Sequence, residues 1–205
     1  MLLIETPTGT ARATLLAPAG APSGLLVLGH GAGGGIGAAD LVAVVGAAVV
    51  AGWRVALVEQ PWRVAGRRIA PAPARLDAGW LPVLAELAGT ASGPLVVGGR
   101  SAGARVACRT AVDGGAAAVL CLAFPLHPPG RPERSRLDEL AGAGVPVLAV
   151  QGRRDPFGTA RELRGLAPDG VRVVEVDGDH GLAAGAEAAA AAVAGWLPGV
   201  GRFGR

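Results

Sequence analysis

The chain has 205 residues, of which 51% are hydrophobic and 17% charged, and this composition excludes a disordered or fibrous protein. The length suits one full hydrophobic core, so we expect a single domain over residues 1–205. The net charge is only +3, every basic residue is an arginine and aromatic residues make up 3% of the chain, so we expect no nucleic-acid partner.

Two short strands are predicted first, over residues 2–5 and 11–17. The sequence Thr-Pro-Thr-Gly between them predicts the turn of an antiparallel hairpin. Continuous apolar runs then follow, and such runs are typical of strands buried on both faces. These runs cover residues 25–28, 55–58, 95–97, 117–122, 147–150 and 171–176.

Segments with helical spacing of their apolar residues alternate with these strands. They cover residues 40–51, 74–87, 102–112, 136–141, 159–166 and 183–197. The alternation predicts an α/β fold with right-handed crossovers and a mostly parallel central sheet, covered by helices on both faces. Because ligands of such sheets bind at the carboxyl ends of the strands, residues just after each apolar run are candidates for a functional site.

Membrane and metal chemistry are not indicated by the sequence. The N-terminal residues lack the basic start and apolar core of a signal peptide, and the most apolar run, residues 41–53, is too short to span a bilayer. We therefore expect a cytoplasmic protein without a membrane partner. Cys108 and Cys121 lie in apolar surroundings without metal-ligand spacing, which predicts buried thiols, no disulfide framework and no metal site.

A candidate nucleophile lies in residues 99–103, whose sequence is Gly-Arg-Ser-Ala-Gly. This sequence fits the G-x-S-x-G pattern, in which a serine is held on a sharp strand-to-helix turn. A chain with 34 glycines can also produce the pattern by chance, so its context must decide. A predicted strand before the motif and a predicted helix after it supply that context for Ser101.

A serine nucleophile needs a general base and a carboxylate that orients the base. His180 follows the last predicted strand, and Asp155 follows the strand predicted over residues 147–150. Taken singly, Asp155 is also typical of a turn cap and His180 of a surface loop. The chain order Ser101, Asp155, His180 is nevertheless the order of the triad that accompanies this serine motif, so together the three predict a catalytic triad.

The glycine-rich loop after residues 25–28 allows two interpretations. Gly29, Gly31 and Gly34 satisfy the G-x-G-x-x-G pattern of a dinucleotide site, which would make the protein an NAD(P)-binding oxidoreductase. Three observations oppose this interpretation: the spacing to Glu59 exceeds the usual interval of about twenty residues, several glycine registers match at once, and a hairpin precedes the loop. The second interpretation is an oxyanion loop, in which a backbone N–H stabilises developing negative charge.

Residues around these loops provide candidates for a substrate pocket. His30 opens the glycine-rich loop and is expected to position it rather than to act as a base. Two proline-rich segments, residues 59–74 and 124–136, lie at the expected edge of the sheet and contribute Trp62 and His127 as candidate pocket walls.

Four arginines near these segments have two interpretations each. Arg100 precedes the candidate nucleophile and either contacts an anionic substrate or forms a salt bridge. Arg63, Arg67 and Arg68 are candidate anion contacts or part of a solvated loop.

Six segments of the chain carry a resemblance to a known family. They are HGAGGG, EQPWR, GGRSAG, FPLHPPG, QGRRDPFG and GDHGL. Over residues 25–197 the chain resembles an α/β hydrolase, in a small lidless branch related to dienelactone hydrolases. That branch is similar to hydrolase-like proteins that include a subunit of a chromatin acetyltransferase complex.

The resemblance implies an α/β-hydrolase fold without a cap domain. It further implies Ser101 as nucleophile, Asp155 as acid and His180 as base, and the backbone N–H groups of Ala32 and Ala102 as the oxyanion hole. Gly33 replaces Ala32 as a donor if the loop shifts slightly. These residues predict a serine hydrolase that needs no cofactor and cleaves an ester or related acyl bond of a small molecule. A non-catalytic interaction protein with the same fold is the alternative.

Overall fold

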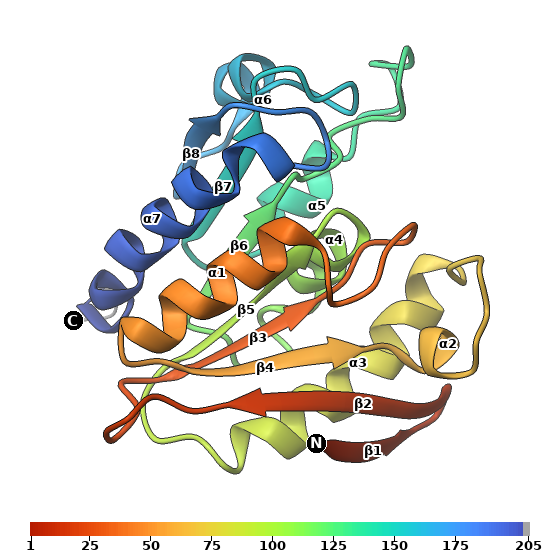
Figure 1. Ribbon diagram of the computed structural model, residues 1–205. Helices are drawn as coiled ribbons and strands as arrows, with labels where there is room; N and C mark the ends of the chain where they lie inside the picture. The colour runs from red at the N-terminus through yellow and green to blue at the C-terminus, as the bar shows by residue number, and fades with distance from the viewer. Residues whose placement is uncertain (203–205) are drawn as a thin grey trace.

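Eight strands form one sheet in the computed structural model, which describes residues 1–202 (Figure 1). In chain order they are β1 (Leu2–Thr6), β2 (Gly9–Leu16), β3 (Leu25–Gly29), β4 (Arg54–Glu59), β5 (Leu95–Arg100), β6 (Ala118–Leu122), β7 (Val147–Gly152) and β8 (Val171–Val176). Their order across the sheet is β1-β2-β4-β3-β5-β6-β7-β8. Most of the continuous apolar runs form the central strands, because a strand covered on both faces has no polar side, and every residue of β3, β6 and β7 is buried. The run over residues 171–176 was wrongly expected to be buried on both faces: it forms the edge strand β8, in which only Val176 is buried.

The N-terminal hairpin is the antiparallel part of the sheet. β1 pairs with β2 and β2 pairs with β4 in antiparallel register, whereas β3 to β8 pair in parallel with their neighbours. Burial alternates along the middle of β2, as expected for a strand with one face on the core. The predicted mostly parallel sheet with an N-terminal hairpin is confirmed.

Helices cover both faces of the sheet (Figure 1). They are α1 (Ala39–Val50), α2 (Pro61–Val64), α3 (Pro73–Ala88), α4 (Ala102–Thr110), α5 (Leu137–Ala141), α6 (Ala160–Leu166) and α7 (Ala186–Trp196), with two 3₁₀ segments, η1 (Ala183–Gly185) and η2 (Leu197–Arg202). On one face α1 and α7 lie side by side, and Leu41 of α1 and Val193 of α7 belong to the same buried cluster. On the other face α3, α4, α5 and α6 contribute to a second cluster, among them Trp80 of α3 and Ala104 of α4.

Two helical elements also differ from the predictions. The short helix α2 lies in the first proline-rich segment and was not predicted, although Pro61 suits the first position of a helix, where its missing N–H costs nothing. The helix predicted over residues 183–197 begins as the 3₁₀ turn η1, and α7 starts only at Ala186.

The helices are short, and both cysteines are buried. None of the helices within residues 1–202 combines the length and apolar character that a membrane-spanning helix needs. Cys108 and Cys121 are buried free thiols with their Sγ atoms 3.5 Å apart, as the apolar context predicted. Their contact and burial raise the pKa of Cys121 well above its usual value, which keeps this thiol protonated.

Candidate active site

Ser101 occupies a strained turn between β5 and α4. Its backbone has φ 53° and ψ −110°, a combination that residues with a side chain rarely adopt. A hydrogen bond to the sheet stabilises this strained conformation: the N–H of Ser101 donates to the carbonyl oxygen of Leu122 at the end of β6, at 2.9 Å. The turn places the serine at the carboxyl end of the central strand, where ligands of parallel sheets bind.

The two glycines that flank the serine are required by packing. A Cβ at Gly99 would lie 2.5 Å from the carbonyl oxygen of Gly29, and a Cβ at Gly103 would lie 2.7 Å from the same atom. The turn therefore approaches the end of β3 only because neither residue has a side chain. This contact gives the G-x-S-x-G pattern a physical cause, separate from the general abundance of glycine.

Three side chains from three loops form a continuous chain of hydrogen bonds. Nε2 of His180 lies 2.8 Å from Oγ of Ser101, and Nδ1 of His180 lies 2.9 Å from Oδ2 of Asp155. Asp155 is 1% exposed, so its carboxylate faces the imidazole with almost no competition from water. A neutral imidazole that donates from Nδ1 has its lone pair on Nε2, where it can accept the serine proton.

Asp155 is itself held by two further donors. Its Oδ1 accepts from the N–H of Phe157 at 2.8 Å, and its Oδ2 accepts from Nε2 of Gln151 at 3.0 Å. Gln151 is fully buried at the end of β7, and its amide also donates to the carbonyl oxygens of Phe124 and Gly158. Sequence reasoning missed this glutamine, although a polar residue that ends an apolar run was a visible signal.

Phe157 is a second residue that sequence reasoning missed. Its ring packs against the imidazole of His180 with a centroid distance of 4.2 Å and an interplanar angle of 33°. The turn that carries His180 is shaped locally, because Oδ1 of Asp179 accepts from the N–H of Gly181 at 2.8 Å. The imidazole is thus fixed by its ring contact as well as by its hydrogen bonds.

Residues with candidate backbone donors line the cavity at Ser101. Ala32, Gly33 and Ala102 line the same cavity as the serine. Ala102 is the first residue of α4, so its N–H has no acceptor within the helix, and the N–H of Ala32 donates to no acceptor in residues 1–202. Free N–H groups beside a nucleophile are the arrangement that stabilises an oxyanion.

His30 holds the glycine-rich loop from behind. Its Nε2 accepts from the N–H of Gln60 at 3.2 Å, so the proton is on Nδ1, which donates to the carbonyl oxygen of Gly31 at 2.9 Å. The side chain is buried, and this burial lowers the pKa of His30 below its usual value and favours the neutral form. His30 therefore contacts the loop and does not line the cavity.

The cavity at Ser101 has a volume of about 470 Å³. It is lined by Ala32, Gly33, Arg100, Ser101, Ala102, Arg105, Pro125, Arg136, Phe157 and His180. Arg100 also forms the salt bridge that its position before the serine suggested: its Nε lies 3.1 Å from Oδ2 of the fully buried Asp40, without hydrogen-bond alignment. Its Nη2 donates to the carbonyl oxygen of His180 at 2.9 Å, so this arginine links α1 to the histidine loop.

Trp62 and His127 do not lie where a substrate pocket was expected. Trp62 belongs to the unpredicted helix α2, which turns its ring toward His30 at a centroid distance of 5.4 Å and into a separate cavity. His127 contacts α6 instead: its Nε2 lies 3.0 Å from Oε1 of Glu162. Arg63, Arg67 and Arg68 are also absent from the lining of the cavity at Ser101.

The described part of the chain contains no cluster of side chains that could bind a metal ion. Within residues 1–202 no group of three or more histidine, cysteine, aspartate or glutamate side chains is close enough to hold a metal ion. The site consists of the hydrogen-bonded side chains, the free backbone donors and the arginines beside them.

Comparison with known proteins gives one family. Residues 22–192 match a family model described as an alpha/beta hydrolase domain. No curated protein sequence is significantly similar to the chain.

Solved structures share the fold at low sequence identity. An alpha-beta serine hydrolase homologue from Coxiella burnetii is 17% identical, with a TM-score of 0.80 and 96% of each chain covered. Est1E from Butyrivibrio proteoclasticus is 16% identical, with a TM-score of 0.79, 97% of this chain and 98% of Est1E covered. A serine hydrolase without a lid from Xanthomonas campestris is 15% identical, with a TM-score of 0.74, 98% of this chain and 92% of that chain covered.

Proposed function

The chain belongs to the alpha/beta hydrolase domain family, and on that premise we propose that it is a serine hydrolase acting on an ester or related acyl bond of a small molecule. The observation that carries the proposal is the unbroken chain of hydrogen bonds from Ser101 Oγ through His180 to Asp155. That chain ends at a serine with a strained backbone, inside a cavity of about 470 Å³. The strained backbone, the end of the hydrogen-bond chain and the cavity are therefore all found at Ser101.

The reaction begins with attack of Ser101 Oγ on the substrate carbonyl carbon, while Nε2 of His180 accepts the hydroxyl proton. The negative charge that develops on the carbonyl oxygen is stabilised by the N–H groups of Ala32 and Ala102. His180 then donates its proton to the leaving oxygen as the bond to the acyl carbon breaks. Water, activated by His180 in the same way, hydrolyses the acyl-serine, and Asp155 stabilises the imidazolium in both halves.

The open form of the cavity suits a small substrate. None of the cavity-lining residues comes from a separate cap domain, and Est1E, which has the same fold, has been determined with ferulic acid bound. We propose that this protein likewise takes small acyl groups, with Phe157 and Pro125 as apolar walls. A relationship to dienelactone hydrolases within the family is part of the proposal.

A fluorophosphonate probe and p-nitrophenyl acetate test the proposed activity. The wild-type protein is expected to be labelled and to hydrolyse the ester, and Ser101→Ala is expected to lose both. Ser92→Ala is the matched control, because Ser92 is an exposed loop serine away from the cavity, and it is expected to keep both activities. A folded wild-type protein that resists the probe and hydrolyses no faster than Ser101→Ala would identify a non-catalytic member of the fold instead.

The dinucleotide interpretation of the glycine-rich loop finds no support in its geometry. A pyrophosphate site needs the helix to open within the loop, whereas α1 begins at Ala39, five residues after Gly34. The loop also packs on the serine turn, since a Cβ at Gly31 would lie 2.9 Å from Nη1 of Arg100. We expect no shift in melting temperature with NAD(H) or NADP(H).

A further inference from the structure

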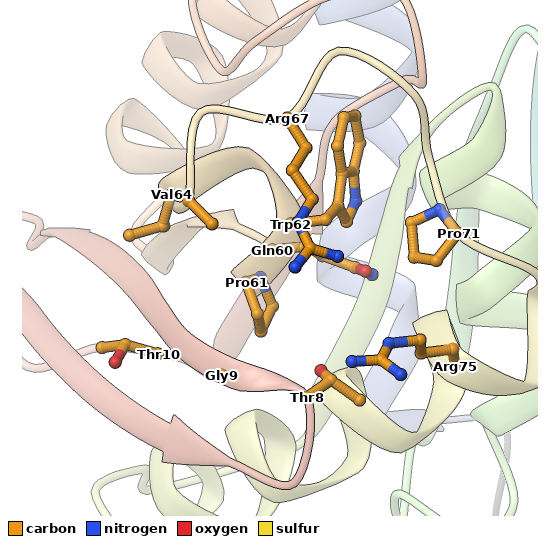
Figure 2. A pocket seen from close by; sticks show the side chains of 11 residues that line it. Thr8, Gly9, Thr10, Gln60, Pro61, Trp62, Val64, Arg67, Pro71 and Arg75 are labelled. Atoms are coloured by element: carbon orange, nitrogen blue, oxygen red, sulfur yellow. The ribbon is translucent and has the colours of Figure 1, made fainter.

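A second cavity lies at the same edge of the sheet and shares no residue with the cavity at Ser101 (Figure 2). Its volume is about 300 Å³, within the range of small-ligand sites. Three segments form it: the turn between β1 and β2, the segment from Gln60 through α2, and the start of α3. The family match and the serine chemistry assign nothing to this cavity.

Gln60 brings an unpartnered amide to the second cavity. The residue is 5% exposed and its backbone N–H is used by His30, but its side-chain amide forms no hydrogen bond with any group in residues 1–202. Figure 2 shows this amide turned into the cavity. Unlike Oε1 of Gln151, the amide atoms of Gln60 are not enclosed by the protein, so they are open to the cavity and free to bind a ligand.

Two arginines face the same space. Arg67 and Arg75 line the cavity, and in Figure 2 their guanidinium groups are turned toward the space beside Gln60 and the hydroxyl group of Thr8. Neither arginine has an ion-pair partner among the carboxylates that the structure describes, whereas Arg109 has two. None of the lining residues is acidic, so nothing in the cavity neutralises this charge.

Apolar side chains also line the second cavity. Pro61, Trp62 and Pro71 line it together with the polar groups. Guanidinium groups bind carboxylate and phosphate oxygens through paired N–H donors, and an amide and a hydroxyl group complete such a site. An indole and two proline rings instead suit a flat apolar body.

We propose that this second cavity binds a small organic anion. Its carboxylate or phosphate oxygens bind Arg67 and Arg75, the amide of Gln60 supplies a further donor, and its apolar part lies against Trp62. The site works independently of Ser101, because the two cavities have no lining residue in common.

Titration calorimetry with simple probes tests the proposal. Benzoate and phenyl phosphate carry the two anionic groups on the same ring, benzyl alcohol lacks the charge and inorganic phosphate lacks the ring. We expect at least one aromatic anion to bind and benzyl alcohol not to bind. Inorganic phosphate is expected to bind at least tenfold more weakly than phenyl phosphate. Failure of both aromatic anions to bind the wild-type protein would overturn the proposal.

Single-residue variants test whether the anion binds in the second cavity. Arg67→Ala and Arg75→Ala are each expected to weaken binding at least tenfold, whereas Arg68→Ala, which removes an adjacent exposed arginine outside the lining, is the control and is expected to bind normally. Ser101→Ala is also expected to bind normally. Equal loss in Arg68→Ala would indicate unspecific attraction to positive charge, and normal binding by Arg67→Ala and Arg75→Ala would place the anion elsewhere; either result contradicts the proposal.

Gln60→Glu gives an independent measurement. A carboxylate at this position is expected to occupy the place of the ligand, so that anion binding is lost while the melting temperature is kept, because both guanidinium groups supply the countercharge. A variant that loses several degrees of melting temperature would show that the two arginines do not reach this buried position, and the proposed site would be wrong. If Gln60→Glu still binds the anion normally, the amide has no part in it.

Discussion

The two cavities at the carboxyl edge of the sheet hold their polar groups in opposite ways. Beside Ser101, each acting side chain is itself bound by another part of the chain, as Asp155 is by Gln151 and His180 is by Asp155. In the second cavity, the amide of Gln60 and the guanidinium groups of Arg67 and Arg75 have no partner among the described residues. Chemistry requires groups preorganised to within a fraction of an ångström, whereas a binding site can leave its donors for the ligand to satisfy.

Removing the charge of Asp155 tests how strongly the activity at Ser101 depends on the side chain that orients His180. Asp155→Asn keeps the shape of the site but offers an amide to His180, so the imidazole no longer keeps the tautomer that accepts the serine proton. We expect kcat for p-nitrophenyl acetate to fall about 10⁴-fold. The exposed Asp169→Asn is the matched control and is expected to keep its rate. A fall below tenfold in Asp155→Asn would mean that the two cavities do not differ as described.

The Arg100–Asp40 pair is a buried part of the same preorganised network. Arg100→Met leaves Asp40 buried without its countercharge, and we expect the free energy of unfolding to fall by about 3 kcal/mol. Adding Asp40→Asn removes that charge and is expected to restore most of the loss, as measured by denaturant unfolding. Burial already raises the pKa of Asp40, which agrees with a carboxylate that depends on its partner. Equal stability of single and double variants would contradict this dependence.

The glycines of the serine turn provide a steric test. Gly103→Ala places a Cβ 2.7 Å from the carbonyl oxygen of Gly29, so we expect a loss of about 1–3 kcal/mol in unfolding free energy together with lower activity. Gly195→Ala is the control, since that glycine lies in α7 with no atom within 4 Å of the added Cβ. The control is expected to gain up to about 1 kcal/mol from helix propensity. A neutral Gly103→Ala would mean that the turn can move away from β3.

His30 lies between the two cavities and gives the smallest expected effect. Burial lowers its pKa, so its contribution to stability is fully present above the unfolded value of about 6.5 and is lost as pH falls through the lower folded value. The unfolding free energy of the wild-type protein should therefore decrease between pH 7 and pH 5, by at most about 1.4 kcal/mol per unit from this residue. His30→Gln is expected to flatten that part of the profile. An unchanged profile would show that His30 does not titrate in this range.

Some parts of the fold and of the candidate active site could be predicted from the sequence and others could not, for a physical reason. Ser101, Asp155 and His180 could be proposed from the sequence because each follows a predicted parallel strand within a few residues, and the carboxyl ends of parallel strands meet at one edge. The positions of the strands and the N-terminal hairpin followed from runs of apolar residues and turn residues in the same local way. Local patterns of this kind survive in any tertiary context that buries them.

Residues that depend on distant partners could not be placed. In the sequence Asp40 only indicates the start of a helix, and its salt bridge with Arg100 depends on the tertiary fold. Trp62 and His127 were expected at the substrate pocket because of their loops, but α2 and Glu162 direct them elsewhere. Gln151 was visible at the end of an apolar run, yet its role depends on three acceptors from loops whose paths the sequence does not specify.

The pairing of α1 with α7 has a consequence for the order of events during synthesis. His180 is 79 residues later in the chain than Ser101, and the helix after it docks on a helix made near the beginning. At about 5–20 residues per second, a ribosome exposes the serine seconds before the histidine exists. Under the proposed mechanism, the hydroxyl group of Ser101 is inactive until His180 and α7 are in place, so the start of ester hydrolysis would report that these later segments have folded onto the earlier ones.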